Sequence, residues 1–155
     1  MSKMMLMLLL MFLMFRGCEQ RPQECRDVID VPREQGYAKF RTYPLEKQLD
    51  VYLCAMHVEP PDMGLANEIA ERGDSTIPAV MQKLKTSETE IDQEDLIYLL
   101  EVMSERGLLR GRKDVIAAIA QVIDSMKISQ VKQRSEERLK KIEIANGMKP
   151  LTCVQ

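Results

Sequence analysis

The chain contains one histidine, so His57 is the only imidazole that could act as a general base or as a nitrogen ligand. Tyr52, Cys54 and Glu59 lie near it in the sequence, which raises the question of a Cys–His nucleophilic pair. On a helix, however, residues three positions apart are turned by about 300° around the axis, and Cys54 belongs to the apolar face. No oxyanion donor or orienting carboxylate can be assigned, so a histidine in solvent or at the edge of the core is the simpler interpretation. The sequence predicts no catalytic residue and no enzyme activity.

An acidic run raises the question of a Ca²⁺ site: Glu88, Glu90, Asp92, Glu94 and Asp95. It lacks the central glycine and the ligand spacing of an EF-hand loop. Carboxylates are favoured at a helix N-terminus, and Asp92 is expected to cap the helix that begins there. We therefore expect no metal and no cofactor. A glycine-rich phosphate loop is also absent from the sequence, because the glycines after residue 70 lie at predicted helix ends.

Four cysteines occur, at positions 18, 25, 54 and 153, without C-x-x-C spacing. With a single histidine, they do not indicate a structural zinc site. Cys54 lies in an apolar helical pattern and is interpreted as a buried free thiol or one half of a bridge. Cys25 and Cys153 lie in the two irregular ends, and a disulfide between them would tie those ends together. If Cys18 is modified, at most one intramolecular disulfide can form; if it is not, three connectivities remain open.

The first seventeen residues are typical of a secretory signal peptide. Lys3 precedes twelve uncharged apolar residues, from Met4 to Phe15. As a helix this run would be about 18 Å long, against a hydrocarbon core of about 30 Å, so it is too short to span a bilayer comfortably. No A-x-A cleavage site follows, because the first alanine is Ala38. We expect residues 1–17 to direct the chain out of the cytoplasm.

Gly17 and Cys18, directly after the apolar run, resemble the lipobox of bacterial lipoproteins. In that family the signal is cut before a cysteine whose thiol carries a diacylglycerol. Phe15 and Arg16 depart from the pattern, where leucine and a small residue are usual. The resemblance implies that Cys18 is a lipid attachment site and that the protein is periplasmic or extracytoplasmic and anchored to the membrane. The alternative is an ordinary signal peptide cut elsewhere, which leaves Cys18 for a disulfide.

The charge balance argues against nucleic acid as a partner. Without Lys3 and Arg16, the 22 basic residues fall to 20, against 24 acidic ones. A net negative chain has no general attraction to nucleic acid or to anionic lipid. Residues 127–141 carry six basic side chains against Glu136 and Glu137. This strip is interpreted as the solvated face of an outer helix, with an acidic partner as the alternative.

Hydrophobic periodicity predicts an all-α fold of about six helices in residues 44–147. An irregular tether or arm, residues 18–43, precedes them, because Pro22, Pro32 and Gly36 lie there among dense charges, with at most a short strand at 37–40. The tail is 148–155. The helices are expected to begin after Pro44 and to cover about 44–56, 62–72, 77–85, 92–106, 112–127 and 129–145. The fifth is the most apolar and is expected at the centre of the core.

A weak internal repeat is present within residues 62–127. The segment Ile69-Ala70-Glu71-Arg72-Gly73 recurs as Met103-Ser104-Glu105-Arg106-Gly107, 34 positions later, and the helices that follow align as well. Two such helix pairs resemble HEAT-like α-solenoid repeats. The resemblance implies stacked antiparallel helix pairs, and an irregular helical bundle is the alternative.

These features together favour a non-catalytic, exported module that binds a protein or peptide in the bacterial cell envelope. An exported immunity or inhibitor protein that blocks a toxin or enzyme is the second interpretation. An enzyme with an unrecognised site is the third.

Overall fold

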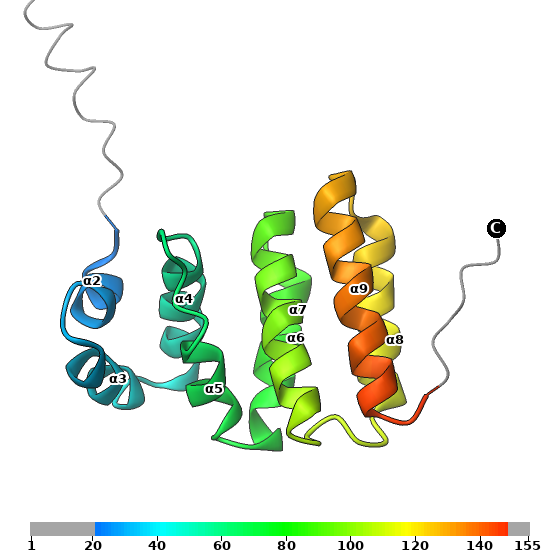
Figure 1. Cartoon of the computed structure of the whole chain (residues 1–155), viewed down its shortest axis with the longest axis horizontal. Coiled ribbons are helices and arrows are strands. Elements are labelled where there is room, and N and C mark those ends of the chain that lie inside the picture. Colours follow the sequence, from blue (N-terminus) through cyan, green and yellow to red (C-terminus); the bar gives the residue numbers. More distant parts are fainter. Residues whose placement is uncertain (1–20, 149–155) are drawn as a thin grey trace, which may run out of the picture.

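The structure is a computed structural model that describes residues 21–148, and this part of the chain is all-α, without strands. Eight α-helices and one short 3₁₀ helix follow one another along the chain and form a packed helical bundle (Figure 1). They are α2 (Gln23–Ile29), α3 (Arg33–Arg41), α4 (Leu45–Met56), α5 (Leu65–Ala70), η2 (Asp74–Thr76), α6 (Ile77–Thr86), α7 (Glu90–Glu105), α8 (Lys113–Ser125) and α9 (Ser129–Ala145). The predicted signal peptide, residues 1–17, and almost all of the tail lie outside the described residues.

The prediction of an irregular arm at residues 18–43 is wrong over residues 23–41, because these residues form α2 and α3. Pro22 and Pro32 each stand directly before the first residue of a helix, where the missing N–H of proline breaks no hydrogen bond. The prolines therefore start helices here instead of interrupting one. Phe40 and Cys25 are completely buried, so the two helices belong to the core.

Gly36 explains how two short, polar helices pack so closely. A Cβ built at this glycine would lie 2.0 Å from the carbonyl oxygen of Val28, on the α2 backbone. Glycine is thus the residue that permits the contact between α2 and α3, although it weakens the helix that contains it. The glycine that suggested an irregular segment in the sequence is a packing residue.

Replacing Gly36 by alanine is expected to lower the free energy of unfolding by about 1–3 kcal/mol, because the backbones must separate to admit the methyl group. Gln35→Ala, on the exposed side of the same helix, is the matched control and should change stability little. Urea unfolding followed by circular dichroism measures both. A gain of about 1 kcal/mol for Gly36→Ala, as helix propensity alone predicts, would show that the close approach does not exist.

From Pro44 onward the predicted helices are confirmed, with bounds that differ by a few residues: α5 and α8 are shorter than predicted, and α7 begins earlier, at Glu90. Pro44 precedes α4, and α9 has the predicted bounds, Ser129–Ala145. Gly73 and Gly107 follow the ends of α5 and α7 and have φ of 86° and 78°, values that glycine adopts at little steric cost. The second helix is reduced to Leu65–Ala70 by the Pro-containing loop before it.

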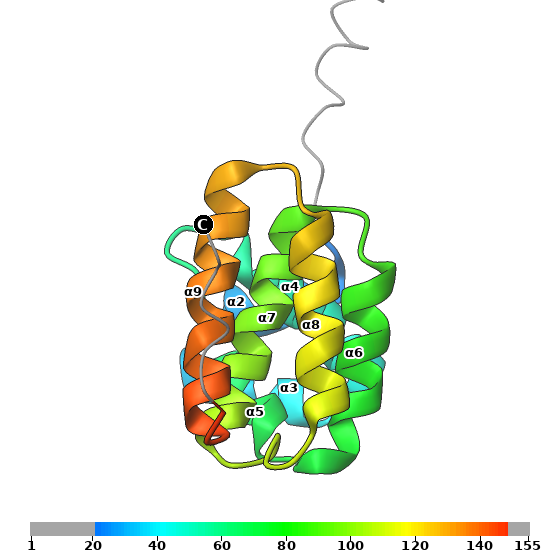
Figure 2. The same ribbon diagram turned by 90° about the vertical axis from the view of Figure 1, so that its right-hand side faces the viewer.

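The helix at the centre of the core is α7, not the predicted fifth helix, now α8. It packs against α4, α5, α6 and α9, and buries six apolar side chains: Leu96, Ile97, Leu99, Leu100, Val102 and Met103. In Figure 2 α8 lies on the outside of the array, with α7 behind it. It buries one face only, through Val115, Ile116, Ile119 and Ile123. High apolar content concentrated on one side is what an outer helix needs, whereas a central helix must bury several sides.

Candidate functional site

His57 lies against the two aspartates of the acidic run, and these three side chains form the clearest candidate site of the described residues. His57 is the residue at which α4 ends, and Asp92 and Asp95 lie in the first two turns of α7. One carboxylate oxygen of Asp92 is 3.1 Å from His57 Nε2, and one of Asp95 is 3.5 Å from the same nitrogen. The three donor atoms all lie within 4.8 Å of one another.

Two hydrogen bonds fix the aspartates on α7. Thr89 is the N-cap residue, and its hydroxyl oxygen accepts from the Asp92 backbone N–H at 3.0 Å. The cap predicted at Asp92 is therefore wrong: Thr89 satisfies the helix end, and the Asp92 side chain is left to face His57. From α4, the buried Tyr52 hydroxyl donates to the Asp95 carbonyl oxygen at 2.6 Å and joins the two helices beside the site.

Asp95 has the most perturbed environment of the three. Burial is the largest of the causes that together raise the pKa of its carboxyl to about 6; the Glu94 and Asp92 carboxylates also raise this pKa, and His57 and Arg138 lower it. Its Oδ2 atom is buried and accepts no hydrogen bond. A carboxylate oxygen that is removed from water without a donor lacks its normal compensation. The cluster therefore holds desolvated negative charge beside an imidazole that is about half exposed.

The arrangement offers one nitrogen and two oxygen donors, and it contains no activated nucleophile. Cys54, three residues before His57, is bonded to Cys25. A disulfide sulfur carries no thiol proton for a base to remove, so the Cys–His pair weighed from the sequence does not form here.

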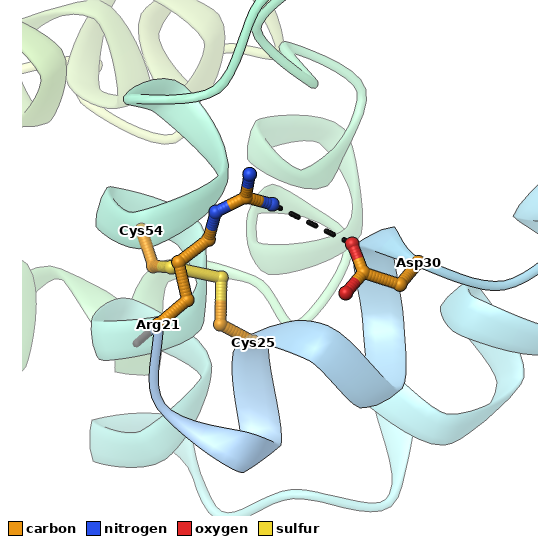
Figure 3. The surroundings of a disulfide bond; sticks show 4 residues. All are labelled: Arg21, Cys25, Asp30 and Cys54. Carbon is orange, nitrogen blue, oxygen red and sulfur yellow. Dashed lines mark hydrogen bonds and ion pairs between the residues drawn. A yellow bond between two sulfur atoms is a disulfide. The ribbon is translucent and has the colours of Figure 1, made fainter. Parts of the chain in front are cut away.

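The Cys25–Cys54 disulfide joins α2 to α4 and corrects the predicted Cys25–Cys153 bridge (Figure 3). The S–S distance is 2.04 Å and the two Cα atoms are 6.2 Å apart. Cys25 came close to Cys54 because residues 23–29 are a helix packed on α4, which the sequence reasoning did not expect. Beside the disulfide, Arg21, which precedes α2, forms an ion pair at 3.5 Å with Asp30, which follows α2. Cys18 and Cys153 lie outside the described residues.

Three of the six basic residues in the strip at 127–141 pair with buried acids of α7. Arg138 and Lys141 both pair with the buried Glu101 of α7, at 2.8 and 2.7 Å. Arg134 pairs in the same way with the buried Glu94. These pairs hold α9 on α7, while the Arg134 and Lys141 side chains are still 54% and 61% exposed, so the strip is a solvated face, as predicted, that also compensates buried acids.

Two hollows in the described surface are small. One lies between α4 and α6, is lined by Leu49, Asp50, Ala79, Gln82 and Lys83 among others, and holds about 290 Å³. Another of about 150 Å³ lies between α8 and α9. Pockets for small molecules usually hold about 300–1,000 Å³, so these grooves suit a side chain or a peptide edge better than a cofactor.

Comparison with family models, curated proteins and solved structures gives no match to this chain. Within residues 21–148, no helix combines the length and apolar character required to cross a membrane.

The sequence reasoning considered His57 and the acidic run separately and so missed their contact. A signal was present: His57 directly follows the predicted first helix, and Asp92 and Asp95 open the predicted fourth. Nothing in the sequence showed that the end of one helix lies beside the start of the other.

Proposed function

We propose that the chain is an exported, non-catalytic helical module, held at the bacterial envelope membrane through Cys18, that binds another protein or a peptide there. The observation that carries the proposal is the Cys25–Cys54 disulfide. Disulfides form and persist in oxidising compartments and are rare in the cytosol of ordinary bacteria. Export also agrees with the lysine and the twelve-residue apolar run at residues 3–15.

The disulfide also gives the anchor a mechanical role. It joins α2, which begins five residues after Cys18, to α4 in the helical core. In a chain tethered by acyl groups at Cys18, α2 would therefore be held on α4 by the disulfide as well as by packing. Two or three acyl chains, at about 0.8 kcal/mol per buried methylene, make a durable anchor.

The groove between α4 and α6 is the surface that best suits a bound segment. Its lining is mainly polar, from Glu46, Asp50, Gln82, Lys83 and Thr86, and it includes the ion pair between Lys83 and Asp50 at 2.6 Å. A narrow groove with a polar and charged lining fits one edge of a peptide or a helix better than a metabolite.

The finer architecture is proposed to be HEAT-like stacking of α5–α6 on α7–α8. In support, the first helices of the two pairs contact each other, as do the second helices. The positive-φ Gly73 and Gly107 end the first helix of each pair, 34 positions apart. Helix pairs that contact their counterparts in this way are typical of α-solenoids.

Export and anchoring are tested on the full chain expressed in a bacterium. We expect the protein in the membrane fraction, with an intact mass that begins at Cys18 and includes lipid, and we expect Cys18→Ser to abolish lipid labelling. Full-length protein that retains Met1 in the soluble cell interior would contradict export. Release of an unlipidated mature form would support export but contradict the anchor.

Partner binding is tested with a photo-crosslinking residue in place of Gln82, inside the groove, in intact cells. Arg110, exposed on the α7–α8 loop, is the matched control position. We expect one discrete adduct from position 82 and none from position 110. Equal adducts from both positions, or none from position 82, would contradict the groove. A partner that is an enzyme, inhibited in the adduct, would favour the inhibitor interpretation.

A further inference from the structure

We propose that His57, Asp92 and Asp95 form a binding site for a divalent first-row transition ion, with Zn²⁺ as the ion that fits the donor set. The inference is independent of the proposed function, since it concerns only the junction of α4 and α7.

The chemistry of the donors favours a transition ion. Imidazole nitrogen is a good ligand for zinc, copper, iron and nickel ions, and zinc also binds aspartate oxygen at about 2.0–2.2 Å. Calcium requires six to eight oxygen ligands, and magnesium keeps near-octahedral oxygen coordination. One imidazole nitrogen with two carboxylates is a poor set for either of these ions. Three protein ligands leave the fourth tetrahedral position for water, and His57, 47% exposed, leaves the site open to solvent.

The spacing of the donors is the second argument. Two ligands bound tetrahedrally to zinc at about 2.05 Å lie about 3.3 Å from each other. The two distances from His57 Nε2 to the carboxylate oxygens are 3.1 and 3.5 Å, and the three donors lie within 4.8 Å of one another. The two separations that involve His57 are thus close to those that a bound ion requires, and the two carboxylate oxygens lie within 4.8 Å of each other.

The charge balance of the cluster is the third argument. Among the described ion pairs, Asp92 and Asp95 have His57 as their common partner and no Lys or Arg. A protonated imidazole supplies one positive charge against two carboxylates. The buried acids further along α7 are compensated differently, because Glu94 pairs with Arg134 and Glu101 with two cations. A divalent ion with a neutral imidazole would balance the two aspartates.

Asp95 Oδ2 provides an independent sign that the site lacks a partner. The atom is buried, accepts no hydrogen bond and faces His57 Nε2 at 3.5 Å. A buried acceptor without a donor is rare in folded proteins, and an ion is one of the partners that satisfies such an atom. Tyr52 donates to the Asp95 carbonyl oxygen and so ties the backbone of this residue to α4.

Helix dipoles act on the site from both sides. The N-terminal end of α7 is partially positive and favours carboxylates in its first turn, where Asp92 lies. The C-terminal end of α4, where His57 lies, is partially negative and favours a cation. A bound ion would therefore join the end of α4 to the start of α7.

The test uses Zn²⁺ alone and the full chain without a histidine tag. All proteins carry Cys18→Ser and Cys153→Ser, because free thiols would bind zinc themselves, and the Cys25–Cys54 disulfide is kept. Calorimetric titration is expected to give one saturable site, and Co²⁺ is expected to develop the visible absorption of a tetrahedral complex. An excess of Mg²⁺ should leave the zinc affinity unchanged.

His57→Gln and Asp95→Asn are each expected to weaken zinc binding by about 100-fold or more, since each removes a direct ligand, and even outer-shell changes cost about 10- to 100-fold. Glu88→Gln is the matched control, because it lies in the same acidic run but outside the cluster, and it should change the affinity less than about 3-fold. Far-UV circular dichroism checks that each variant keeps the helical fold. Absence of saturable binding, or equal loss in Glu88→Gln and His57→Gln, would overturn the proposal.

Discussion

Replacing Cys25 and Cys54 together by alanine is expected to lower the free energy of unfolding by about 3–4 kcal/mol. The bond closes a loop with a sequence separation of 29 residues, and cross-linking a loop of this length restricts the unfolded chain by about that amount. The effect should be large because α2, a helix of only seven residues, has little other means of staying on the core. Chemical denaturation of the oxidised protein and of the variant measures the difference.

Reductant provides the matched control for this prediction. Treating the parent protein with a thiol reductant should lower its stability to that of the double variant, and the same reductant should leave the double variant unchanged. If the parent unfolds at the same denaturant concentration with and without reductant, the Cys25–Cys54 bond does not contribute as expected.

Removing both cationic partners of Glu101 is expected to have the second large effect. In the double variant Arg138→Met, Lys141→Met, the Glu101 carboxylate, whose side chain is 6% exposed, would lose the ion pairs that compensate its burial. Breaking buried pairs on one side costs about 3–5 kcal/mol, and we expect about 3 kcal/mol here because Arg138 and Lys141 are themselves partly exposed. Thermal and urea unfolding measure the loss, which should appear as weaker docking of α9 on α7.

A third substitution distinguishes charge burial from simple loss of contacts. Adding Glu101→Met to the double variant should restore most of the stability, because apolar replacements of a buried ion pair are often neutral or stabilising. Lys83→Met, which breaks a more exposed pair with Asp50, is the surface control and should change stability by less than about 1 kcal/mol. If the triple variant is no more stable than the double, buried charge is not what makes the double variant unstable.

The two interactions fix opposite ends of the bundle. The disulfide holds α2 on α4 at one end, and the Glu101 pairs hold α9 on α7 at the other (Figure 1). Arg138 also stacks on the Tyr98 ring, 4.7 Å from its centroid, so this clamp combines charge with packing. The core between these ends is almost entirely aliphatic, with α7 in the middle.

The local signals in the sequence were sufficient for much of the secondary structure. From Pro44 to Gly147, apolar periodicity, prolines at helix starts and glycines at helix ends placed every longer helix to within a few residues. Such signals work because the backbone groups at a helix end need hydrogen-bond partners, or the chain must turn through a residue with positive φ. Both requirements favour particular residue types at the helix end.

The sequence by itself determined the all-α character of the described residues and the approximate helix ends after residue 44. Tertiary structure alone decided that Pro22 and Pro32 start helices, that Cys25 meets Cys54, that α7 is central and that His57 lies against Asp92 and Asp95. The physical reason is the same in each case. A helix-forming pattern depends on neighbours within about four positions, whereas these contacts join residues 29 to 38 positions apart, or depend on which helix face packs against another.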